Sequence, residues 1–474
     1  MNRSIQTAVR ASVRAAATTL VAAGIAGCSG GTSGVATQKA LPGIAPSPTA
    51  TPGQRSSGTT APSFGKITHV VFIIQENRTF DNLFQGFPGA DAQSYGLDSN
   101  NKKIALSEAS FISPFDPSHT HPSWVGDYNG GKMNGFDKEP ATDPSGNIQE
   151  PIVPDYAYQY VEPLETLPYV QLATQYTLAD RMFQSIQGPT FPSHQYLVAG
   201  TSGGVIDDST TLTLWGCDAP TGTTTQILAP GPPENPILPN PPTTAVFPCF
   251  DYLTMADLLD RSNQSWKYYA PIEGDLGGSE EAYQDDRNIR FSSDYETKVI
   301  SPETGILTDV TLAPLPAMTW VVPAFENSDH AQEPTPTGPA WVSSVVNAIG
   351  MSGSWNSTAI FIVWDEWGGW YDHVSPPQLD DYGLSFRVPL IVVSPYAKKG
   401  YVSHVQHEFG SMLKFAEETL DLGSLGTTDV RADDLMDCFD FTKPPSAFTP
   451  LSAARPLSFF TQLHATHGSN RVDY

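Results

Sequence analysis

The sequence predicts an α/β protein in which a doubly wound, mostly parallel sheet carries helices on both faces and long loop insertions. Three observations lead to this prediction. Runs of strand length are almost continuously apolar and rich in β-branched residues, which is typical of strands buried on both faces. These runs alternate with segments of helical pattern, the order expected of a doubly wound sheet. The 42 prolines and 39 glycines among 474 residues indicate many loops.

The predicted elements begin with the apolar run ITHVVFII, which opens the ordered part of the chain. In doubly wound sheets, ligands bind beyond the carboxyl ends of the strands, so polar residues that follow the apolar runs are the first candidates for chemistry. The strands are predicted at residues 67–74, 318–322, 359–364 and 388–393, and the clearest helices at residues 341–349 and 410–420.

The N-terminus has the features of an export signal. Arg3, Arg10 and Arg14 form a positive start, residues 15–26 are apolar, and the small pair Ala-Gly precedes Cys28. This arrangement resembles a bacterial lipobox, with Cys28 as the acylated first residue of the mature protein. The alternative is an ordinary signal peptide with a chance cysteine. We therefore expect an exported protein that is attached to the membrane of the cell envelope through Cys28.

Composition divides the chain into three parts. Residues 1–27 are predicted as a lipoprotein signal peptide, and residues 28–65, rich in Gly, Ser, Thr, Ala and Pro, as a disordered tether. Residues 66–474 are predicted as one catalytic domain. With 50 acidic against 25 basic residues the formal charge is −25, which argues against a nucleic-acid partner. A small phosphate ester remains possible where a metal ion supplies positive charge, and the acidic composition weakly favours activity at acid pH.

Three cysteines remain after the export signal. Cys217 and Cys249 bracket a segment with nine prolines, and an oxidising compartment favours a disulfide between them. Cys438 would then be single and buried. Three cysteines allow three pairings, so this one is a hypothesis.

Acidic and amide residues follow two of the predicted strands. Glu76 and Asn77 come directly after the first strand, and Asp365 and Glu366 come directly after the strand at 359–364. Carboxylate and amide oxygens are ligands for hard cations, and adjacent carboxylates repel each other unless a cation neutralises them. The alternatives are a capped strand-to-helix turn at the first pair and a polar surface turn at the second.

A third polar segment surrounds Thr190, in the sequence GPTFPSH. A hydroxyl at a helix N-terminus faces free backbone amides, which suits phosphate binding or an activated nucleophile. The alternative is that Thr190 is an N-cap, a common role of threonine. Although a lone histidine is more often structural, several near strand ends could contact phosphate or protonate a leaving oxygen. They are His119, His121, His330, His404 and His407. His464 and His467 are expected at the surface.

Together these segments resemble the bacterial phosphoesterase family that contains phospholipases C and related acid phosphatases. The resemblance runs from about residue 67 to residue 420. It rests on ENRTFD (76–81), NGGKM (129–133), GPTFP (188–192), DEWGG (365–369), DHV (372–374), and Val388 with Pro389.

The resemblance implies an alkaline-phosphatase-like fold and one divalent metal ion, either calcium, magnesium, manganese or iron. It further implies metal ligation by Glu76, Asn77, Asp365 and Glu366, and Thr190 as a nucleophile that forms a phospho-threonine intermediate. His119, His330 and His373 are the expected contacts to phosphate or to the leaving group. Some family members have Asn-Arg at the positions of Ser193 and His194. The resemblance therefore predicts no substrate contacts for these two residues.

The sequence leaves three possible functions, two of them hydrolysis of phosphate esters and one without catalysis. The first is phospholipase C-like cleavage of phospholipids, and the second is a broad-specificity acid phosphatase acting on small phosphate esters. Sulfatases share the fold but need a cysteine or serine nucleophile with an arginine four residues later, whereas this chain has Thr190 and His194. A non-catalytic envelope lipoprotein on the same fold is the third possibility, and the complete set of site residues argues against it.

Overall fold

The strand β1 (His69–Gln75) lies in the middle of the main sheet, and all its residues after His69 are buried. The computed structural model describes residues 65–143, 147–149, 155–210, 215–229, 238–272, 281–333 and 337–467. These residues belong to one compact unit, Pro52–Tyr474. The predicted signal peptide, Cys28 and nearly all of the predicted tether lie outside the described residues, as do the side chains of His464 and His467.

Among the described residues the main sheet has eight strands, and β17 is the one that runs antiparallel to its neighbours. The predicted mostly parallel sheet is therefore confirmed. The strand order is β14 (Val299–Ile300), β13 (Trp266–Tyr269), β15 (Met318–Val321), β1, β16 (Thr358–Trp364), β17 (Leu390–Val393), β9 (Thr177–Ala179) and β18 (Tyr401–Ser403).

The four strands predicted from apolar runs are β1, β15, β16 and β17, and they form four adjacent strands of the sheet. They are buried on both faces because helices cover both sides. The other four strands were not predicted. They have two to four residues each, and all but β14 contain polar or aromatic residues, as in the sequence WKYY of β13.

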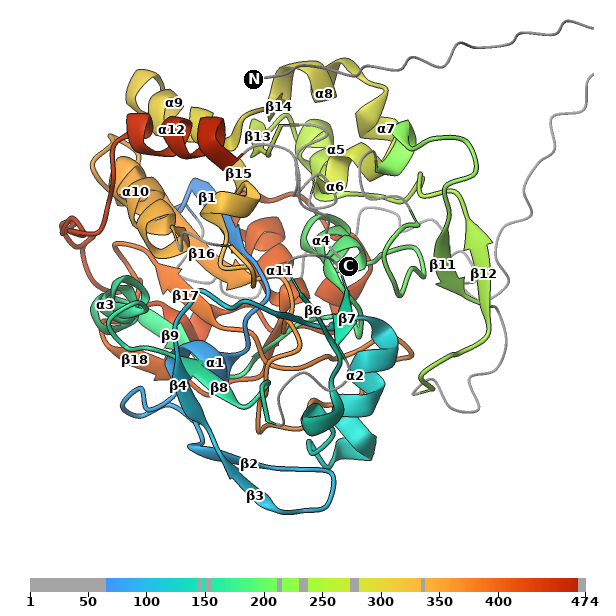
Figure 1. The fold of residues 1–474 in the computed structure, drawn as a ribbon. Helices are drawn as coiled ribbons and strands as arrows, with labels where there is room; N and C mark the ends of the chain where they lie inside the picture. The colour runs from blue at the N-terminus through green and yellow to red at the C-terminus, as the bar shows by residue number, and fades with distance from the viewer. Residues whose placement is uncertain are drawn as a thin grey trace, which may run out of the picture. The chain divides into compact units, whose positions relative to one another are not determined.

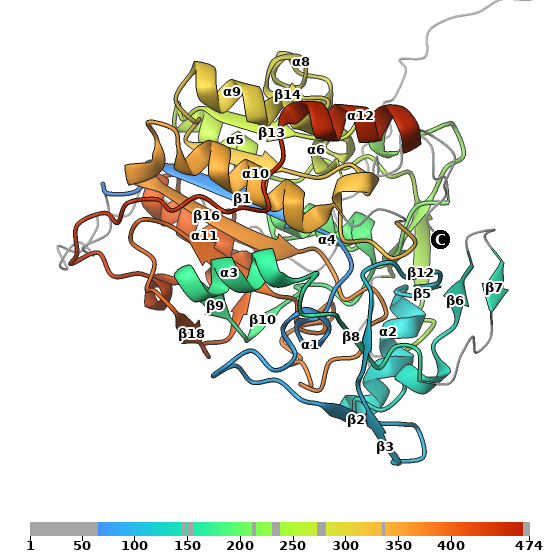
Figure 2. The same ribbon diagram turned by 60° about the vertical axis from the view of Figure 1, so that its left-hand side comes forward.

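Helices cover the two faces of the sheet, as the prediction requires (Figures 1 and 2). On one face, α3 (Leu167–Gln175) packs beside α10 (Gly338–Gly350); on the other, α4 (Thr190–Ala199) packs beside α11 (Phe409–Leu420). The helix predicted at 341–349 is one turn longer at its start, where Pro339 occupies the first turn. Further helices are α5 (Met255–Arg261), α9 (Ile306–Leu312) and α12 (Leu457–His467).

Short elements outside the main sheet form the long insertions. The helices are α1 (Phe80–Phe84), α2 (His121–Tyr128), α6 (Ala282–Asp285), α7 (Arg287–Arg290) and α8 (Ser293–Lys298). The small sheets pair β2 (Tyr95–Leu97) with β3 (Lys103–Ala105), β4 (Ser107–Ala109) with β8 (Gln159–Val161), β10 (Met182–Phe183) with β19 (His407–Glu408), β11 (Thr225–Leu228) with β12 (Thr243–Val246), and β5 (Asp116–Pro117) with β6 (Ala141–Thr142) and β7 (Ile148–Gln149).

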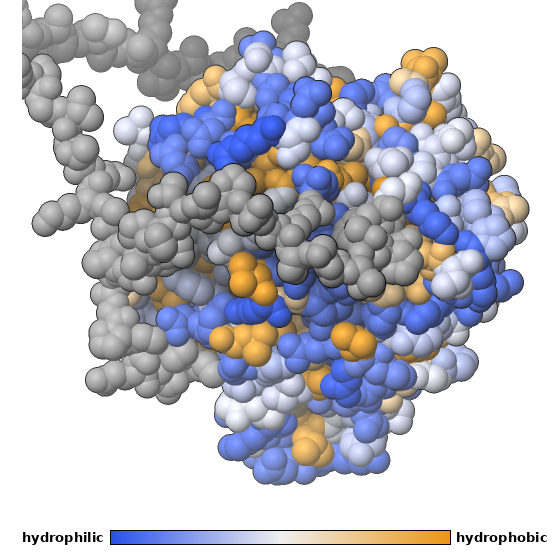
Figure 3. Space-filling model, turned by 180° about the vertical axis from the view of Figure 1, so that it is seen from behind, coloured by the Kyte–Doolittle hydropathy of each residue, from blue (hydrophilic) through white to orange (hydrophobic). Residues whose placement is uncertain are grey.

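The core lies between the sheet and its helices. Phe72 of β1 makes edge-to-face contacts with Trp320 and Phe361 of the two neighbouring strands, at centroid distances of 6.2 and 5.8 Å. Such aromatic contacts stabilise the middle of the sheet beyond simple burial. Seen from behind, the surface is mostly hydrophilic, with hydrophobic residues in separate patches (Figure 3). Within the described part of the chain, no helix is long and apolar enough to span a membrane.

The cysteine hypothesis is confirmed. Cys217 and Cys249 form a disulfide with a Cα–Cα distance of 4.6 Å, and the loop it closes contains the hairpin β11–β12. Cys438 is a free, buried thiol. On the chain-entropy model the disulfide stabilises the fold by roughly 3–4 kcal/mol.

Candidate active site

The parallel pairing of β1 with β16 brings two pairs of polar residues together. Because Gln75 lies opposite Trp364, the residues that follow each strand leave the sheet side by side. The Asn77 backbone N–H donates to Asp365 Oδ1 at 3.1 Å, and the Glu366 N–H donates to the same oxygen at 2.8 Å. The two loops can lie this close because residue 368 is a glycine. A Cβ at this position would lie 2.3 Å from the Asn77 carbonyl oxygen, so any other residue would force the loops apart.

These side chains are buried and oxygen-rich. Glu76, Asn77, Asp365 and Glu366 are each at most 1 % exposed, and Trp364 and Trp367 beside the second pair are fully buried. The polar surface turn considered for Asp365 and Glu366 is therefore wrong. The pKa of Glu366 is raised well above its ordinary value, mainly by burial and further by the negative charge of the neighbouring Asp365 carboxylate.

Three buried oxygens near this point accept no hydrogen bond: Asn77 Oδ1, Asp365 Oδ2 and Glu366 Oε1. Buried polar atoms normally have partners, and oxygens left over in this way are suited to a cation. The donor set consists of carboxylate and amide oxygens, which fits calcium, magnesium, manganese or iron. The residues therefore fit the metal ion that the sequence led us to expect, and the ligand assignment stays a prediction.

Thr190 is the first residue of α4, and the N-cap is Pro189. The alternative interpretation of Thr190 as an N-cap is therefore wrong. The residue is 7 % exposed and lies at the positive end of a helix of ten residues. Its hydroxyl is thus placed where an anion or a developing alkoxide is favoured.

The first turn of α4 packs against the end of β16. The Ser193 hydroxyl donates to the Asp365 carbonyl oxygen at 2.5 Å, and His194 Nε2 lies 3.4 Å from Asp365 Oδ2. The N–H of Phe191 donates to Asp208 Oδ1 at 3.1 Å. His194 and Asp208 were not among the predicted site residues. His194 could have been found from its position one helical turn after Thr190, which places both residues on the same side of the helix. No feature of the sequence pointed to Asp208.

His119 and His330 lie beside the same oxygens. His119 Nε2 is 3.5 Å from Asn77 Nδ2 and 3.7 Å from Glu366 Oε1, while its Nδ1 contacts the Pro117 carbonyl oxygen at 2.9 Å. The ring of His330 lies edge-on to that of His119, at a centroid distance of 6.1 Å. The structure thus brings both histidines to the cluster, and their contact with a phosphate or a leaving group stays a prediction.

His373 lies in a different network. Its Nδ1 contacts Asp81 Oδ2 at 2.6 Å and its Nε2 contacts Asp91 Oδ1 at 3.2 Å. Arg387, fully buried, donates to both oxygens of Asp372 at 2.9 and 3.0 Å in the same network. No contact joins His373 to Thr190 within the described part of the chain. Its predicted contact with phosphate stays a prediction, and the geometry assigns it a structural ion pair.

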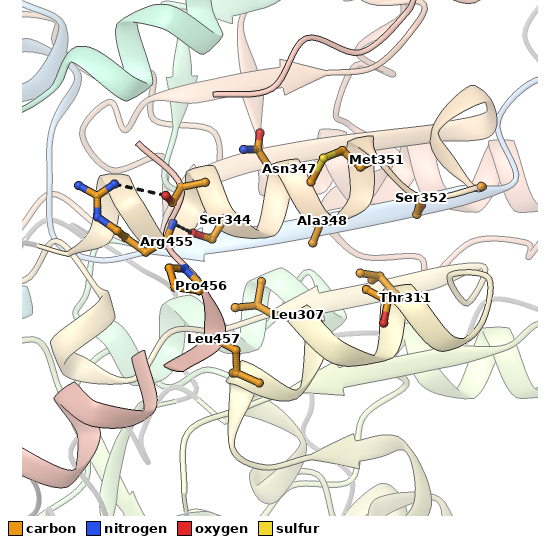
Figure 4. Close-up of a pocket in the computed structure, with 13 residues that line it drawn as sticks. Leu307, Thr311, Ser344, Asn347, Ala348, Met351, Ser352, Arg455, Pro456 and Leu457 are labelled. Atoms are coloured by element: carbon orange, nitrogen blue, oxygen red, sulfur yellow. Dashed lines mark hydrogen bonds between the residues drawn. The ribbon is translucent and has the colours of Figure 1, made fainter. Parts of the chain in front are cut away.

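A groove of about 550 Å³ lies elsewhere, between α9, α10 and the segment before α12 (Figure 4). Among the described residues that line it, apolar side chains outnumber polar ones, and Arg455 is the single charged residue. Arg455 Nη1 donates to the Ala454 carbonyl oxygen at 3.3 Å, and its backbone N–H donates to the Ser344 hydroxyl at 2.7 Å. The groove shares no residue with the strand-end cluster.

The fold and the cluster define an α/β protein with a candidate hydroxyl nucleophile and a candidate cation site, a class that includes metal-assisted hydrolases. Residues 67–423 match the model of the Phosphoesterase family, and the chain belongs to this family of hydrolases. The family resemblance inferred from the motifs is thereby confirmed.

Several curated relatives of the chain are phospholipases C. The chain is 24 % identical to the non-hemolytic phospholipase C of Burkholderia pseudomallei, over 89 % of this chain and 65 % of that protein. It is 25 % identical to phospholipase C A of Mycobacterium tuberculosis, over 82 % of this chain and 80 % of that protein. A solved structure from Vibrio parahaemolyticus, titled as a protein of the alkaline phosphatase superfamily, is 11 % identical over 81 % of this chain and 72 % of that chain, with a TM-score of 0.36.

Proposed function

We propose that the protein is a metal-dependent phosphoric ester hydrolase of phospholipase C type, which cleaves phospholipids through a phospho-threonine at Thr190. The observation that carries the proposal is the position of Thr190. It begins α4 without acting as its cap, and the same helix turn contacts Asp365 of the strand-end cluster. The names of the relatives support a phospholipid as the substrate class.

Glu76, Asn77, Asp365 and Glu366 would hold one divalent cation through their oxygens. Bound there, the cation would lower the pKa of the Thr190 hydroxyl and neutralise charge on the phosphate. The buried carboxylates would keep the cation in place, and Gly368 allows the loop after β16 to approach the Asn77 backbone closely.

The chain's own residues would then carry out two displacements. In the first, Thr190 releases its hydroxyl proton to water and Oγ1 attacks phosphorus. The bond from phosphorus to the diacylglycerol oxygen breaks, and a protonated histidine donates its proton to that oxygen. His119 and His330 are the candidates because both lie at the cluster. In the second, water attacks the phospho-threonine and gives one proton to the histidine left neutral by the first step. The bond from phosphorus to Thr190 Oγ1 breaks, Oγ1 takes up a proton from water, and the phosphorylated head group leaves.

A broad-specificity acid phosphatase is the second candidate, and Asp207 is the observation that favours it. Burial raises the pKa of the Asp207 carboxyl to about 6, and the nearby His119 acts in the opposite direction. A carboxyl group that keeps its proton in mildly acid solution does not repel a dianionic monoester. Activity at acid pH on small monoesters would follow from this arrangement.

Hydrolysis of two chromogenic substrates separates these functions. We expect turnover of para-nitrophenylphosphorylcholine, its loss with a chelator, and its recovery on adding back a divalent metal ion. Turnover of para-nitrophenyl phosphate alone would replace the phospholipase proposal with the acid phosphatase. If neither substrate is cleaved by the metal-loaded protein, and phosphatidylcholine vesicles release no phosphocholine, the non-catalytic alternative replaces both.

The proposal includes export and attachment to the membrane through a lipid on Cys28. The support is the sequence of the N-terminus alone, because this segment lies outside the described residues. In cells that express the full chain, the wild type is expected in the membrane fraction and Cys28→Ser in the soluble fraction. An unchanged distribution would contradict acylation of Cys28.

A further inference from the structure

A group of side chains that could hold a metal ion lies at the β18 edge of the main sheet, away from the β1–β16 strand ends. It consists of His407 in β19 and of Asp437 and Cys438 in the 3-10 helix η9 (Met436–Cys438). His407 Nε2 lies 3.7 Å from Asp437 Oδ1, and Cys438 Sγ lies 3.6 Å from the same oxygen. The three donor atoms all lie within 4.8 Å of one another.

The neighbours of these residues orient the donor atoms toward a common point. His407 Nδ1 contacts Asp433 Oδ1 at 2.7 Å, so this nitrogen donates its hydrogen there and Nε2 faces the group. Asp433 is itself held by the Ser411 hydroxyl at 2.7 Å. A carboxylate on the second nitrogen of a histidine is the usual arrangement around a metal-binding imidazole.

Ser403 fixes the third donor. Its hydroxyl donates to Asp437 Oδ2 at 2.5 Å and lies 3.1 Å from His407 Nε2. The other oxygen of Asp437, Oδ1, is the one that faces His407 and Cys438. One carboxylate oxygen is thus occupied by a hydroxyl, and the other is directed at the imidazole and the thiol.

We propose that His407, Asp437 and Cys438 bind a zinc ion. Zinc bonds of about 2.0–2.3 Å in a tetrahedron place neighbouring donor atoms roughly 3.3–3.8 Å apart, and the two distances from Asp437 Oδ1 lie in this range. A set of one nitrogen, one oxygen and one sulfur selects zinc over calcium or magnesium, because a thiolate is a soft ligand. This preference differs from that of the all-oxygen cluster at β1 and β16.

The burial of the group suits an ion that enters from one side. The His407 and Cys438 side chains are buried, whereas the Asp437 and Asp433 side chains are 25 and 26 % exposed. A water molecule or the Ser403 hydroxyl completes the tetrahedron. Binding replaces the Cys438 S–H bond with a sulfur–zinc bond and releases the proton to solvent. The ion would join β19 to η9 across the sheet edge.

A metal-free interpretation of the same contacts exists. A protonated His407 could pair with Asp433 and Asp437 at once, beside a buried Cys438 thiol that takes no part. The two interpretations differ in whether sulfur binds metal, so the test needs a signal that only a sulfur–metal bond gives.

Cobalt(II), which replaces zinc and is coloured, supplies this signal. We expect the full chain, freed of metal with a chelator, to develop the near-ultraviolet charge-transfer band of a thiolate–cobalt bond on titration with Co²⁺, and Zn²⁺ to abolish it. Cys438→Ser and His407→Gln should lose the band, and Asp433→Asn should weaken Co²⁺ binding about 10–100-fold.

Two control variants separate this site from other metal binding. Asp365→Asn and Cys28→Ser should keep the band, because the first changes the all-oxygen cluster and the second removes the other cysteine outside the disulfide. Absence of the band in the wild type, or its persistence in Cys438→Ser, would overturn the proposal. The wild-type titration decides the question even if Cys438→Ser does not fold.

Discussion

Replacing Thr190 with alanine separates the role of a nucleophile from that of a helix cap. Thr190 begins α4 behind the N-cap Pro189, whereas Thr254 is the N-cap of α5. Thr254 accepts a hydrogen bond from the Asp257 N–H and takes part in a capping box. Both threonines are buried, so Thr254→Ala is a matched control for Thr190→Ala.

The expected stability changes follow from these contacts. Thr190→Ala loses a mostly buried methyl group, worth about 0.8 kcal/mol, and gains up to about 0.7 kcal/mol of helix propensity. The free energy of unfolding should therefore change by less than about 0.5 kcal/mol. Thr254→Ala loses a capping hydrogen bond and should destabilise the protein by about 1–2 kcal/mol.

The expected activity changes are the reverse. Removing a nucleophile lowers kcat on the order of 10⁴-fold or more, which corresponds to about 5.5 kcal/mol of transition-state stabilisation. Thr254→Ala should keep kcat within about a factor of two, since it lies on α5, away from the cluster. Thr190→Ser should keep measurable activity because it retains the hydroxyl.

Urea unfolding gives the stability of each variant, and kcat/KM on para-nitrophenylphosphorylcholine gives its activity. The assignment of Thr190 is refuted if Thr190→Ala retains activity within tenfold of the wild type. It is also refuted if Thr190→Ala is as destabilised as Thr254→Ala, because loss of activity would then report damage to the helix.

Two further predictions concern buried charges. Arg387→Met leaves the buried Asp372 carboxylate without its paired cation and should destabilise the protein by about 3–5 kcal/mol in urea unfolding. Arg181→Met, which removes the half-exposed partner of Asp91 beside the same network, should lower the free energy of unfolding by at most about 1 kcal/mol. Equal destabilisation by the two variants would contradict the importance of burial. For Glu303, burial raises the pKa to about 7 from 4.5. Its bound proton therefore stabilises the fold fully below pH 4.5, and this stabilisation is lost as the pH rises through 7. Glu303→Gln should therefore remove a decline in the free energy of unfolding of about 3 kcal/mol between about pH 5 and 8, and an unchanged pH profile would show that Glu303 ionises normally.

Much of the fold could be predicted because strands that are buried on both faces are continuous apolar runs in the sequence. Residues 67–74 and 359–364 are long apolar runs, and the sheet does bury them on both faces. The short strands β9 and β18 could not be predicted. Each has three residues, and neighbouring strands rather than their own composition hold them in the sheet.

The site was predictable where its residues adjoin a predicted strand. Glu76 with Asn77, and Asp365 with Glu366, follow β1 and β16, and parallel pairing alone brings them together. The surroundings of His373 could not be predicted in this way. It adjoins no strand, and its partners Asp81 and Asp91 lie almost 300 residues earlier.

The sequence by itself determined the α/β class, the family, three possible cysteine pairings with Cys217–Cys249 favoured, and the strand ends at which polar residues gather. Each of these depends on local pattern, on motif order or on a count of few residues. The tertiary structure alone decided that β17 runs antiparallel, that Thr190 is not a cap, and that His194 contacts Asp365. These features depend on which distant segments pack together, and a linear pattern of burial carries no information about partners far along the chain.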